Sequence, residues 1–171
     1  MIRGIHHVAI HVRDMDRMIR FYREAFGFEQ VDEGFTWKDS PEIDEIIGVP
    51  GSSARNVMLQ AGNCYLEMFQ FIAPDAQSSK PLDPFDHGYT HFCVDATDIA
   101  AEVERLSTIG MTFERAHGPG KPVDFGIVKS IYGRDPEGNL IEIQETAADC
   151  RFDASRLPKA DLARSDADGQ S

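Results

Sequence analysis

The stretch RDPEGNLIEIQE, Arg134–Glu145, decides how the rest of the chain is interpreted. Its Asp135–Gly138 segment has the residues of a tight turn, because proline presets a backbone angle and glycine accepts a positive φ. The alternation that follows predicts a strand with Ile141 and Ile143 on one face and Glu142 on the other. A carboxylate between apolar neighbours is costly unless a cation or hydrogen-bond donors compensate it. Taken alone, the stretch also fits an edge strand whose glutamate is solvated.

Length and composition indicate the class of protein. The chain has 171 residues, 42% hydrophobic and 27% charged, which is typical of one soluble domain or two small modules sharing a core. A formal net charge of -12 argues against a nucleic-acid partner, since phosphate contacts require clustered Lys and Arg. The start, MIRGIHHVAI, lacks signal-peptide features and no apolar run reaches membrane-spanning length, so we expect a cytoplasmic protein without a membrane partner. The cysteines Cys64, Cys93 and Cys150 are expected to be reduced thiols.

The first half of the chain opens with a strand and a helix. Alternation over Ile5–Val12 places Val8 on an apolar face and His7 on the opposite face. Asp14 can cap a helix of apolar residues at helical spacing, and Gly27 supplies a left-handed stop. The pattern therefore predicts a strand that carries a histidine, followed by a capped helix.

Further strands are expected before the middle of the chain. Phe28–Trp37 is predicted as a second strand, and Lys38–Ala54 as a loop with one helical turn. Arg55–Gln60 and Cys64–Phe71 are typical of a hairpin, in which Glu67 lies on the face opposite its apolar neighbours.

The pattern then restarts after a proline-rich linker. Gly88–His91 repeats the order of the first strand, and an aspartate follows seven residues after each histidine, at Asp14 and Asp98. The second series is predicted as a helix from Asp98 to Gly110, a strand over Met111–Glu114, a loop over Ala116–Asp124, and strands over Phe125–Tyr132 and Asn139–Glu145.

We therefore expect an α+β fold of two paired βαβββ modules that form a U-shaped mixed sheet. The modules are residues 1–71 and 88–145, joined by a linker at 72–87. Residues 146–171 mix acids and bases without periodicity and are expected to be flexible or to form an interface arm, so we also expect a homodimer.

Four side chains occupy the same phase of equivalent strands: His7, Glu67, His91 and Glu142. If the modules pair into one curved sheet, these side chains converge inside it. Two imidazoles and two carboxylates suit one divalent ion of Zn, Ni, Co, Mn, Fe or Mg, and leave positions open for water or substrate. The pattern thus favours a catalytic metal site over a closed structural one.

The chain resembles the vicinal oxygen chelate superfamily, which includes glyoxalase I, methylmalonyl-CoA epimerase, extradiol dioxygenases and the bleomycin and fosfomycin resistance proteins. The resemblance rests on GIHHVAIHVRD, GNCYLEMFQF, GYTHFCVD and RDPEGNLIEI, and it covers residues 4–145. It implies a U-shaped cavity around a divalent metal, with ligand positions that match His7, Glu67, His91 and Glu142.

The resemblance also implies a reaction class. We expect a metal-dependent isomerase or lyase, glyoxalase- or epimerase-like, that abstracts a proton next to a carbonyl of a small oxygenated substrate. Glu67 and Glu142 are the candidate catalytic bases. The alternatives are a ring-cleaving dioxygenase, for which a three-ligand set makes Glu67 superfluous, and a non-catalytic binding protein of the resistance type. The chain departs from the epimerases, because the loop before the third strand carries no clean second acid.

Several other residues have two interpretations. Trp37, Phe69, Phe125 and Tyr132 are typical of a core, although an aromatic-lined pocket would suit an apolar or aromatic substrate. His11 shares the face of His7 and is either a surface residue or part of the cavity lining.

Overall fold

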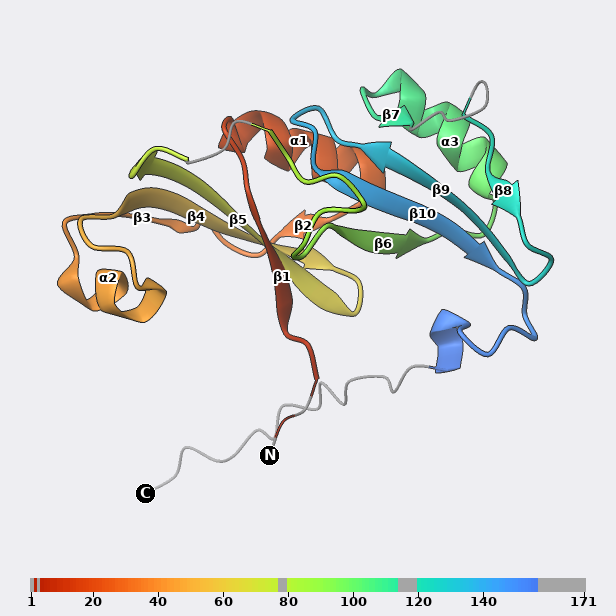
Figure 1. The fold of residues 1–171 in the computed structure, drawn as a ribbon, viewed down its shortest axis with the longest axis horizontal. Coiled ribbons are helices and arrows are strands. Elements are labelled where there is room, and N and C mark those ends of the chain that lie inside the picture. Colours follow the sequence, from red (N-terminus) through yellow and green to blue (C-terminus); the bar gives the residue numbers. More distant parts are fainter. Residues whose placement is uncertain (1, 3, 77–79, 114–119, 157–171) are drawn as a thin grey trace.

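The computed structural model of the chain describes residues 2, 4–76, 80–113 and 120–156 (Figure 1). Its first half holds β1 (His7–His11), α1 (Met15–Phe26), β2 (Glu29–Gln30), β3 (Phe35–Lys38), α2 (Pro41–Ile47), β4 (Ser53–Ala61) and β5 (Cys64–Ala73). Its second half holds β6 (His91–Asp95), α3 (Ile99–Thr108), β7 (Thr112–Phe113), β8 (Val123–Asp124), β9 (Val128–Arg134), β10 (Leu140–Thr146) and the short 3-10 helix η1 (Ala154–Arg156). The same order of strand, helix and strands occurs twice, as expected.

The strands form two five-stranded mixed sheets, one from each half of the chain. The first has the order β1-β5-β4-β2 with β3 also on β4, and the second has β6-β10-β9-β7 with β8 also on β9. The pairs β1–β5 and β6–β10 are parallel, and the other pairs are antiparallel. This confirms the α+β class and the paired βαβββ modules. Hydrogen bonding leaves β1 and β6 at the ends of separate sheets, so the strands do not form one continuous sheet.

The helix α1 forms where local signals predicted it. The Asp14 carboxylate accepts a hydrogen bond from the Arg17 N–H at 3.0 Å, and Gly27 ends the helix at a φ of 67°. Met15, Met18, Phe21, Tyr22 and Ala25 are buried against the sheets. In α3, Asp98 caps the helix in the same way, through the Ala101 N–H at 3.1 Å.

The predicted strand over Phe28–Trp37 is wrong as a single element, because a turn divides it into β2 and β3. Gly34 adopts a φ of 71° and its N–H donates to the Asp32 carboxylate at 2.8 Å. A Cβ on Gly34 would lie 2.0 Å from the Asn56 carbonyl oxygen, so this close approach of two backbones requires glycine.

The expected loop over Lys38–Ala54 contains more structure than one turn. Ser40 lies at the N-cap of α2 with Pro41 at the first helical position, and β4 already begins at Ser53. The Asp44 carboxylate accepts hydrogen bonds from the Gly51 N–H at 2.6 Å and the Ser52 N–H at 2.9 Å, which closes the segment after the helix.

In the second half, the predicted strand over Phe125–Tyr132 begins later, at Val128, because a turn precedes it. Gly126 has a φ of 88° and donates to the Asp124 carboxylate at 2.7 Å, so β8 and β9 form a hairpin. The end of the expected loop over Ala116–Asp124 is therefore β8, while residues 114–119 lie outside the described part of the chain.

The modules share one hydrophobic core, to which α1 and α3 contribute from the same side of the molecule (Figure 1). Side chains of the second module hydrogen-bond to the backbone at both ends of α1. The Glu137 carboxylate accepts from the Arg13 and Asp14 N–H groups at 2.6 and 2.8 Å, and Arg105 donates to the Ala25 carbonyl at 2.5 Å. These contacts fix one module against the other.

The predicted boundaries at residues 72–87 and 146–171 stay predictions. β5 continues to Ala73 and η1 lies in the tail region, of which residues 157–171 are outside the described part. None of the helices in the described ranges is long and apolar enough to cross a membrane.

Candidate functional site

The first module brings His7 and Glu67 together. The parallel pairing of β1 with β5 sets Ala9 opposite Glu67, so the histidine and the glutamate project from the same face. His7 Nε2 lies 3.2 Å from Glu67 Oε2, and these side chains are 40% and 17% exposed. From β4, the Asn56 amide donates to Glu67 Oε1 at 2.9 Å. One carboxylate oxygen is therefore held by a neutral donor, and the other faces the imidazole.

The second module repeats this arrangement with His91 and Glu142. His91 Nε2 lies 3.4 Å from Glu142 Oε2, with side chains 29% and 19% exposed. The Ser130 hydroxyl on β9 donates to Glu142 Oε1 at 2.5 Å, and the Tyr132 hydroxyl lies 3.3 Å from His91 Nε2.

Asn56 and Ser130 occupy equivalent positions in the two sheets. Asn56 lies opposite Phe69, which is two residues after Glu67. Ser130 lies opposite Gln144, which is two residues after Glu142. Neither residue was predicted from the sequence. The available signal was a short polar side chain on the same strand face as the glutamate, beside the strand that carries it.

The four predicted ligands thus lie in the structure as two His–Glu pairs. Within the described residues, no three or more His, Cys, Asp and Glu side chains are grouped so that they could hold one ion. Convergence of all four on one metal stays a prediction.

The donor atoms of each pair fit a divalent metal. Ligand atoms about 2.0–2.2 Å from one ion, at tetrahedral or octahedral angles, lie roughly 3.0–3.5 Å apart. The observed N···O separations of 3.2 and 3.4 Å fall in this range. The bonds from Asn56 and Ser130 also orient the carboxylates, as partners of metal ligands do in known sites.

The groups around Glu142 are held in their protonated forms. Desolvation, followed by the Glu142 charge, raises the pKa of the Cys93 thiol to about 12. The same two causes raise the pKa of the Tyr132 hydroxyl. The raised pKa of Cys93 favours the neutral thiol, in line with the expectation that the cysteines are reduced thiols.

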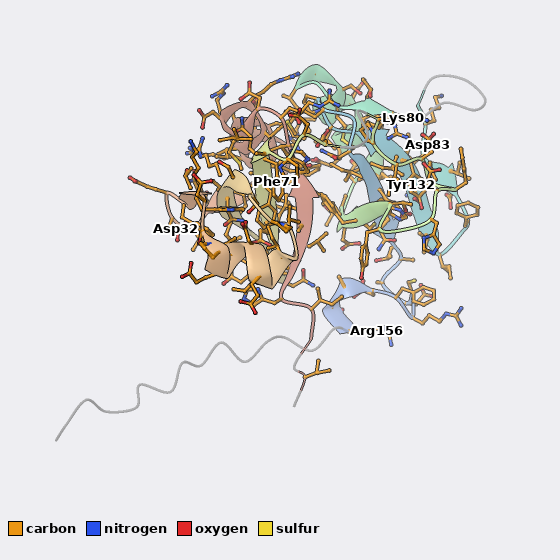
Figure 2. All side chains as sticks on the ribbon, turned by 60° about the vertical axis from the view of Figure 1, so that its left-hand side comes forward. Asp32, Phe71, Lys80, Asp83, Tyr132 and Arg156 are labelled. Carbon is orange, nitrogen blue, oxygen red and sulfur yellow. The ribbon has the colours of Figure 1, made fainter. Side chains whose placement is uncertain are left out.

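Most of the residues with two interpretations lie on the faces that carry the pairs, and Phe125 does not. His11 lies on the His7 face, where its Nε2 accepts the Phe71 N–H at 3.3 Å and its ring lies 5.5 Å from the Phe71 ring. Desolvation lowers the pKa of His11, so its imidazole is neutral. Figure 2 shows Phe71 on the first module and Tyr132 on the second. Trp37 is buried, whereas Phe125 is 70% exposed in the β8–β9 turn and not in the core.

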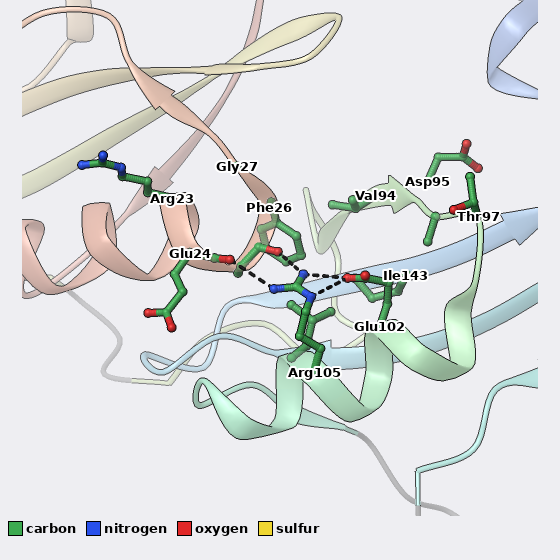
Figure 3. A pocket seen from close by; sticks show the side chains of 13 residues that line it. Arg23, Glu24, Phe26, Gly27, Val94, Asp95, Thr97, Glu102, Arg105 and Ile143 are labelled. Carbon is green, nitrogen blue, oxygen red and sulfur yellow. Dashed lines mark hydrogen bonds and ion pairs between the residues drawn. The ribbon is translucent and has the colours of Figure 1, made fainter.

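A separate cavity of about 470 Å³ lies between the end of α1 and one side of α3 (Figure 3). None of the four predicted ligands lines it. Arg105 extends across it to the carbonyls of Glu24 and Ala25 and to the Glu102 carboxylate, which stabilises the junction between the modules.

Comparison with known proteins places this geometry in a family. The sequence profile of the Glyoxalase/Bleomycin resistance protein/Dioxygenase superfamily matches residues 4–143. A 2-epi-5-epi-valiolone epimerase from an Actinomyces species is 30% identical over 110 residues, which are 60% of this chain and 57% of that protein. The mitochondrial methylmalonyl-CoA epimerase of Mus musculus is 23% identical, over 82% of this chain and 72% of the relative.

A solved structure has the same fold. The crystal structure of a glyoxalase family protein from Bacillus cereus has a TM-score of 0.73 at 20% identity, and the match covers 85% of this chain and 95% of that one. At this identity the likeness concerns the fold. Together with the profile match over nearly all of both modules, it means that the chain belongs to the glyoxalase/bleomycin resistance protein/dioxygenase superfamily.

Proposed function

We propose that this chain is a divalent-metal-dependent isomerase or lyase that removes a proton next to a carbonyl of a small oxygenated substrate. The observation that carries the proposal is the His–Glu pair in each module, with one oxygen of each glutamate held by a neutral donor. Two relatives that are epimerases by name support this reaction class.

His7, Glu67, His91 and Glu142 would hold the ion, which would be Zn, Ni, Co, Mn, Fe or Mg. When bound, such an ion polarises a carbonyl oxygen and offsets the negative charge that develops there as the neighbouring C–H loses its proton. The chain itself provides the orientation of the carboxylates and a base for the proton.

The proposed base is a glutamate oxygen that faces its histidine. The Asn56 amide occupies Glu67 Oε1, so Oε2 is the atom that would hold the ion and that would accept a proton from the substrate once the carboxylate has left the ion. Ser130 constrains Glu142 in the same way, leaving its Oε2 beside His91. Each module therefore offers one candidate base.

We further propose that a second copy of the chain completes each metal site. β1 and β6, which carry His7 and His91, end their respective sheets, so their outer edges face away from the strands of their own module. Ile5 and Tyr89, at equivalent positions just before these strands, are 79% and 100% exposed. Large apolar side chains beside sheet edges are typical of surfaces that another chain covers. Pairing β1 of one copy with β6 of the other would unite one His–Glu pair from each.

Mixing of variants tests this assembly. His7→Ala and His91→Ala chains, each with a different affinity tag, are co-expressed and the doubly tagged dimer is purified. In that dimer one site retains both histidines and the other retains neither, so about one ion per dimer is expected, against almost none in either variant alone. A single-chain site would show no such rescue. A wild-type chain that binds no divalent metal would contradict the whole proposal.

The reaction class is tested with Glu67→Gln. An amide oxygen can still coordinate the ion, so the variant should retain metal but lose about 10²–10⁴-fold in the rate of deuterium exchange from solvent. Methylmalonyl-CoA and 2-hydroxyacetophenone serve as probes, because each has an acidic C–H beside a carbonyl. Oxygen uptake without proton exchange would favour a dioxygenase instead, and metal-free ligand binding would favour a binding protein.

A further inference from the structure

Four aromatic side chains form a continuous surface on the first module, next to the His7–Glu67 pair. This surface, the aromatic wall, consists of Phe35, Trp37, Phe69 and Phe71. Phe69 and Phe71 stack at 28° with ring centres 5.8 Å apart, and Trp37 meets both edge-on at 6.1 and 6.0 Å. Phe35 extends the surface at 5.5 Å from Trp37. Edge-on and offset arrangements of this kind are the favourable ones for aromatic rings.

The wall faces the same space as the proposed catalytic carboxylate. Glu67, Phe69 and Phe71 alternate along β5 and so project from one face of the sheet. Side chains two positions apart on a strand are separated by roughly 7 Å. A ring attached next to oxygens that lie at Glu67 would therefore extend toward Phe69, and a longer aromatic group would continue onto Phe71.

Hydrogen bonds hold the wall in place while leaving part of it accessible. The buried Trp37 donates from Nε1 to the Ser52 hydroxyl at 2.7 Å, and that hydroxyl donates to Asp44. Phe35 is 52% exposed, and Phe69 and Phe71 are half-buried. The indole is thus a fixed support, and the phenylalanine rings present the surface.

The second module lacks this surface at the equivalent positions. Register on β10 places Gln144 and Thr146 where β5 has Phe69 and Phe71, counted from Glu142 and Glu67. The two His–Glu pairs are built alike, yet the residues two and four positions after each glutamate differ: they are aromatic in the first module and polar in the second. A general packing requirement of the fold would give aromatic residues in both modules.

We propose that the substrate carries an aromatic ring next to its chelating oxygens, and that this ring lies on the aromatic wall while the oxygens face Glu67. The proposal rests on the proposed metal-dependent function and specifies the substrate class of that same site. The polar face of the second module then contacts the oxygen-bearing side of the substrate.

Acetohydroxamate and benzohydroxamate provide the test, because they chelate through the same two oxygens and differ in a methyl group against a ring. Affinities are measured by calorimetry on zinc-loaded protein. The emission of Trp37, the single tryptophan of the chain, reports on occupancy of the wall without any activity assay. We expect benzohydroxamate to bind about tenfold tighter or more, and to alone change the tryptophan emission.

Matched variants locate the effect. Phe71→Thr and Phe69→Gln install the residue types of the second module, and Phe35→Thr alters the most exposed ring without touching β5. Each should bring the two affinities to within about threefold while leaving acetohydroxamate binding and metal content unchanged. Phe152→Gln, at a ring that is 61% exposed and outside the wall, should keep the preference.

The outcomes separate the two proposals. Equal binding of both hydroxamates by the wild type, or a preference that survives all three wall variants, overturns the aromatic substrate while the metal site stands. If neither compound binds in a metal-dependent manner, the proposed function fails, and the aromatic substrate fails with it.

Discussion

Replacing Tyr22 by Phe should weaken the junction between the modules while preserving its packing. The Tyr22 hydroxyl on α1 donates a buried hydrogen bond of 2.7 Å to Asp135 Oδ2 in the turn between β9 and β10. Asp135 is only 3% exposed and also accepts from the Glu137 N–H, the Asn139 N–H and the Asn139 amide, at 2.8, 2.9 and 2.8 Å. The variant therefore removes one of the donors of a buried carboxylate and leaves the others in place.

The expected cost follows from these contacts. A hydrogen bond to a charged group contributes about 1.5–3 kcal/mol, and the remaining donors on Asp135 keep the loss near about 2 kcal/mol. For a domain of this size, that lowers the Tm by about 4–8 °C. Ring packing is not expected to add to the loss, since the neighbours of the Tyr22 ring are aromatic carbons of Phe21, Phe26, Phe28 and Phe92.

The dependence on pH gives the prediction a second signature. Burial, and then the Asp135 charge, raises the pKa of Tyr22 well above its ordinary value of 10.0. A raised pKa contributes stability that is complete below the unfolded-state pKa and is lost as the pH rises above it. The difference in the free energy of unfolding between wild type and Tyr22→Phe should therefore narrow by about 1.4 kcal/mol at about pH 11.

Urea unfolding at neutral and alkaline pH measures both quantities. Tyr89→Phe is the control, because the Tyr89 side chain is 100% exposed in the chain and the variant keeps its apolar ring, so its free energy of unfolding should stay at the wild-type value. If the free energy of unfolding of Tyr22→Phe at pH 7 lies within about 0.5 kcal/mol of the wild-type value, the contribution assigned to this hydrogen bond is refuted. A difference that stays constant through alkaline pH would refute the assigned cause.

Three further substitutions test the turns and the junction. Gly34→Ala should cost about 2–4 kcal/mol in urea unfolding, because its Cβ would lie 2.0 Å from the Asn56 carbonyl oxygen at a φ of 71°; a loss under about 0.5 kcal/mol would contradict the close approach. The Ser52 hydroxyl lowers the pKa of Asp44, so the stability that the Asp44 carboxylate contributes is present above the ordinary value of 3.8 and is lost as the pH falls through the lowered pKa. Because Ser52 also accepts from Trp37, protonation of Asp44 should change the tryptophan emission, and Asp44→Asn should abolish that change. An emission change in acid that is the same in Asp44→Asn as in the wild type would count against this link. Arg105→Met should cost about 1–2 kcal/mol, since two carbonyls at the end of α1 lose their donor; an unaltered Tm would exclude that role.

Local chemistry explains why part of the fold could be predicted from the sequence. Asp14 and Gly27 act on the helix next to them, so the bounds of α1 need no knowledge of distant residues. Alternation likewise sets the faces of β5 and β10, and the glutamates Glu67 and Glu142 project as predicted. The Asp135–Gly138 turn also forms, with the Gly138 N–H donating to the Asp135 carbonyl at 3.0 Å.

The remaining features depend on contacts between distant segments. Gly34 divides the predicted second strand because the backbone of β4 passes within van der Waals distance, which residues 28–37 alone do not reveal. Asn56 contacts Glu67 because β4 pairs with β5 in a particular register. That register depends on both strands, so the sequence of either strand alone does not reveal the contact. The distance of each histidine from its glutamate has the same origin.

The Asp135 turn links the stability of the fold to the geometry of the proposed metal site. It binds α1 of the first module through Tyr22 and Glu137, and it leads directly into the strand that carries Glu142. Under the proposed assembly each chain contributes one His–Glu pair to each of two sites, so both sites can close only if the angle between the modules is fixed. Apolar packing alone is not directional, whereas a buried carboxylate with several donors accepts few orientations. We therefore expect this turn to do more than join two strands: its hydrogen bonds set the angle at which two copies can complete both sites together.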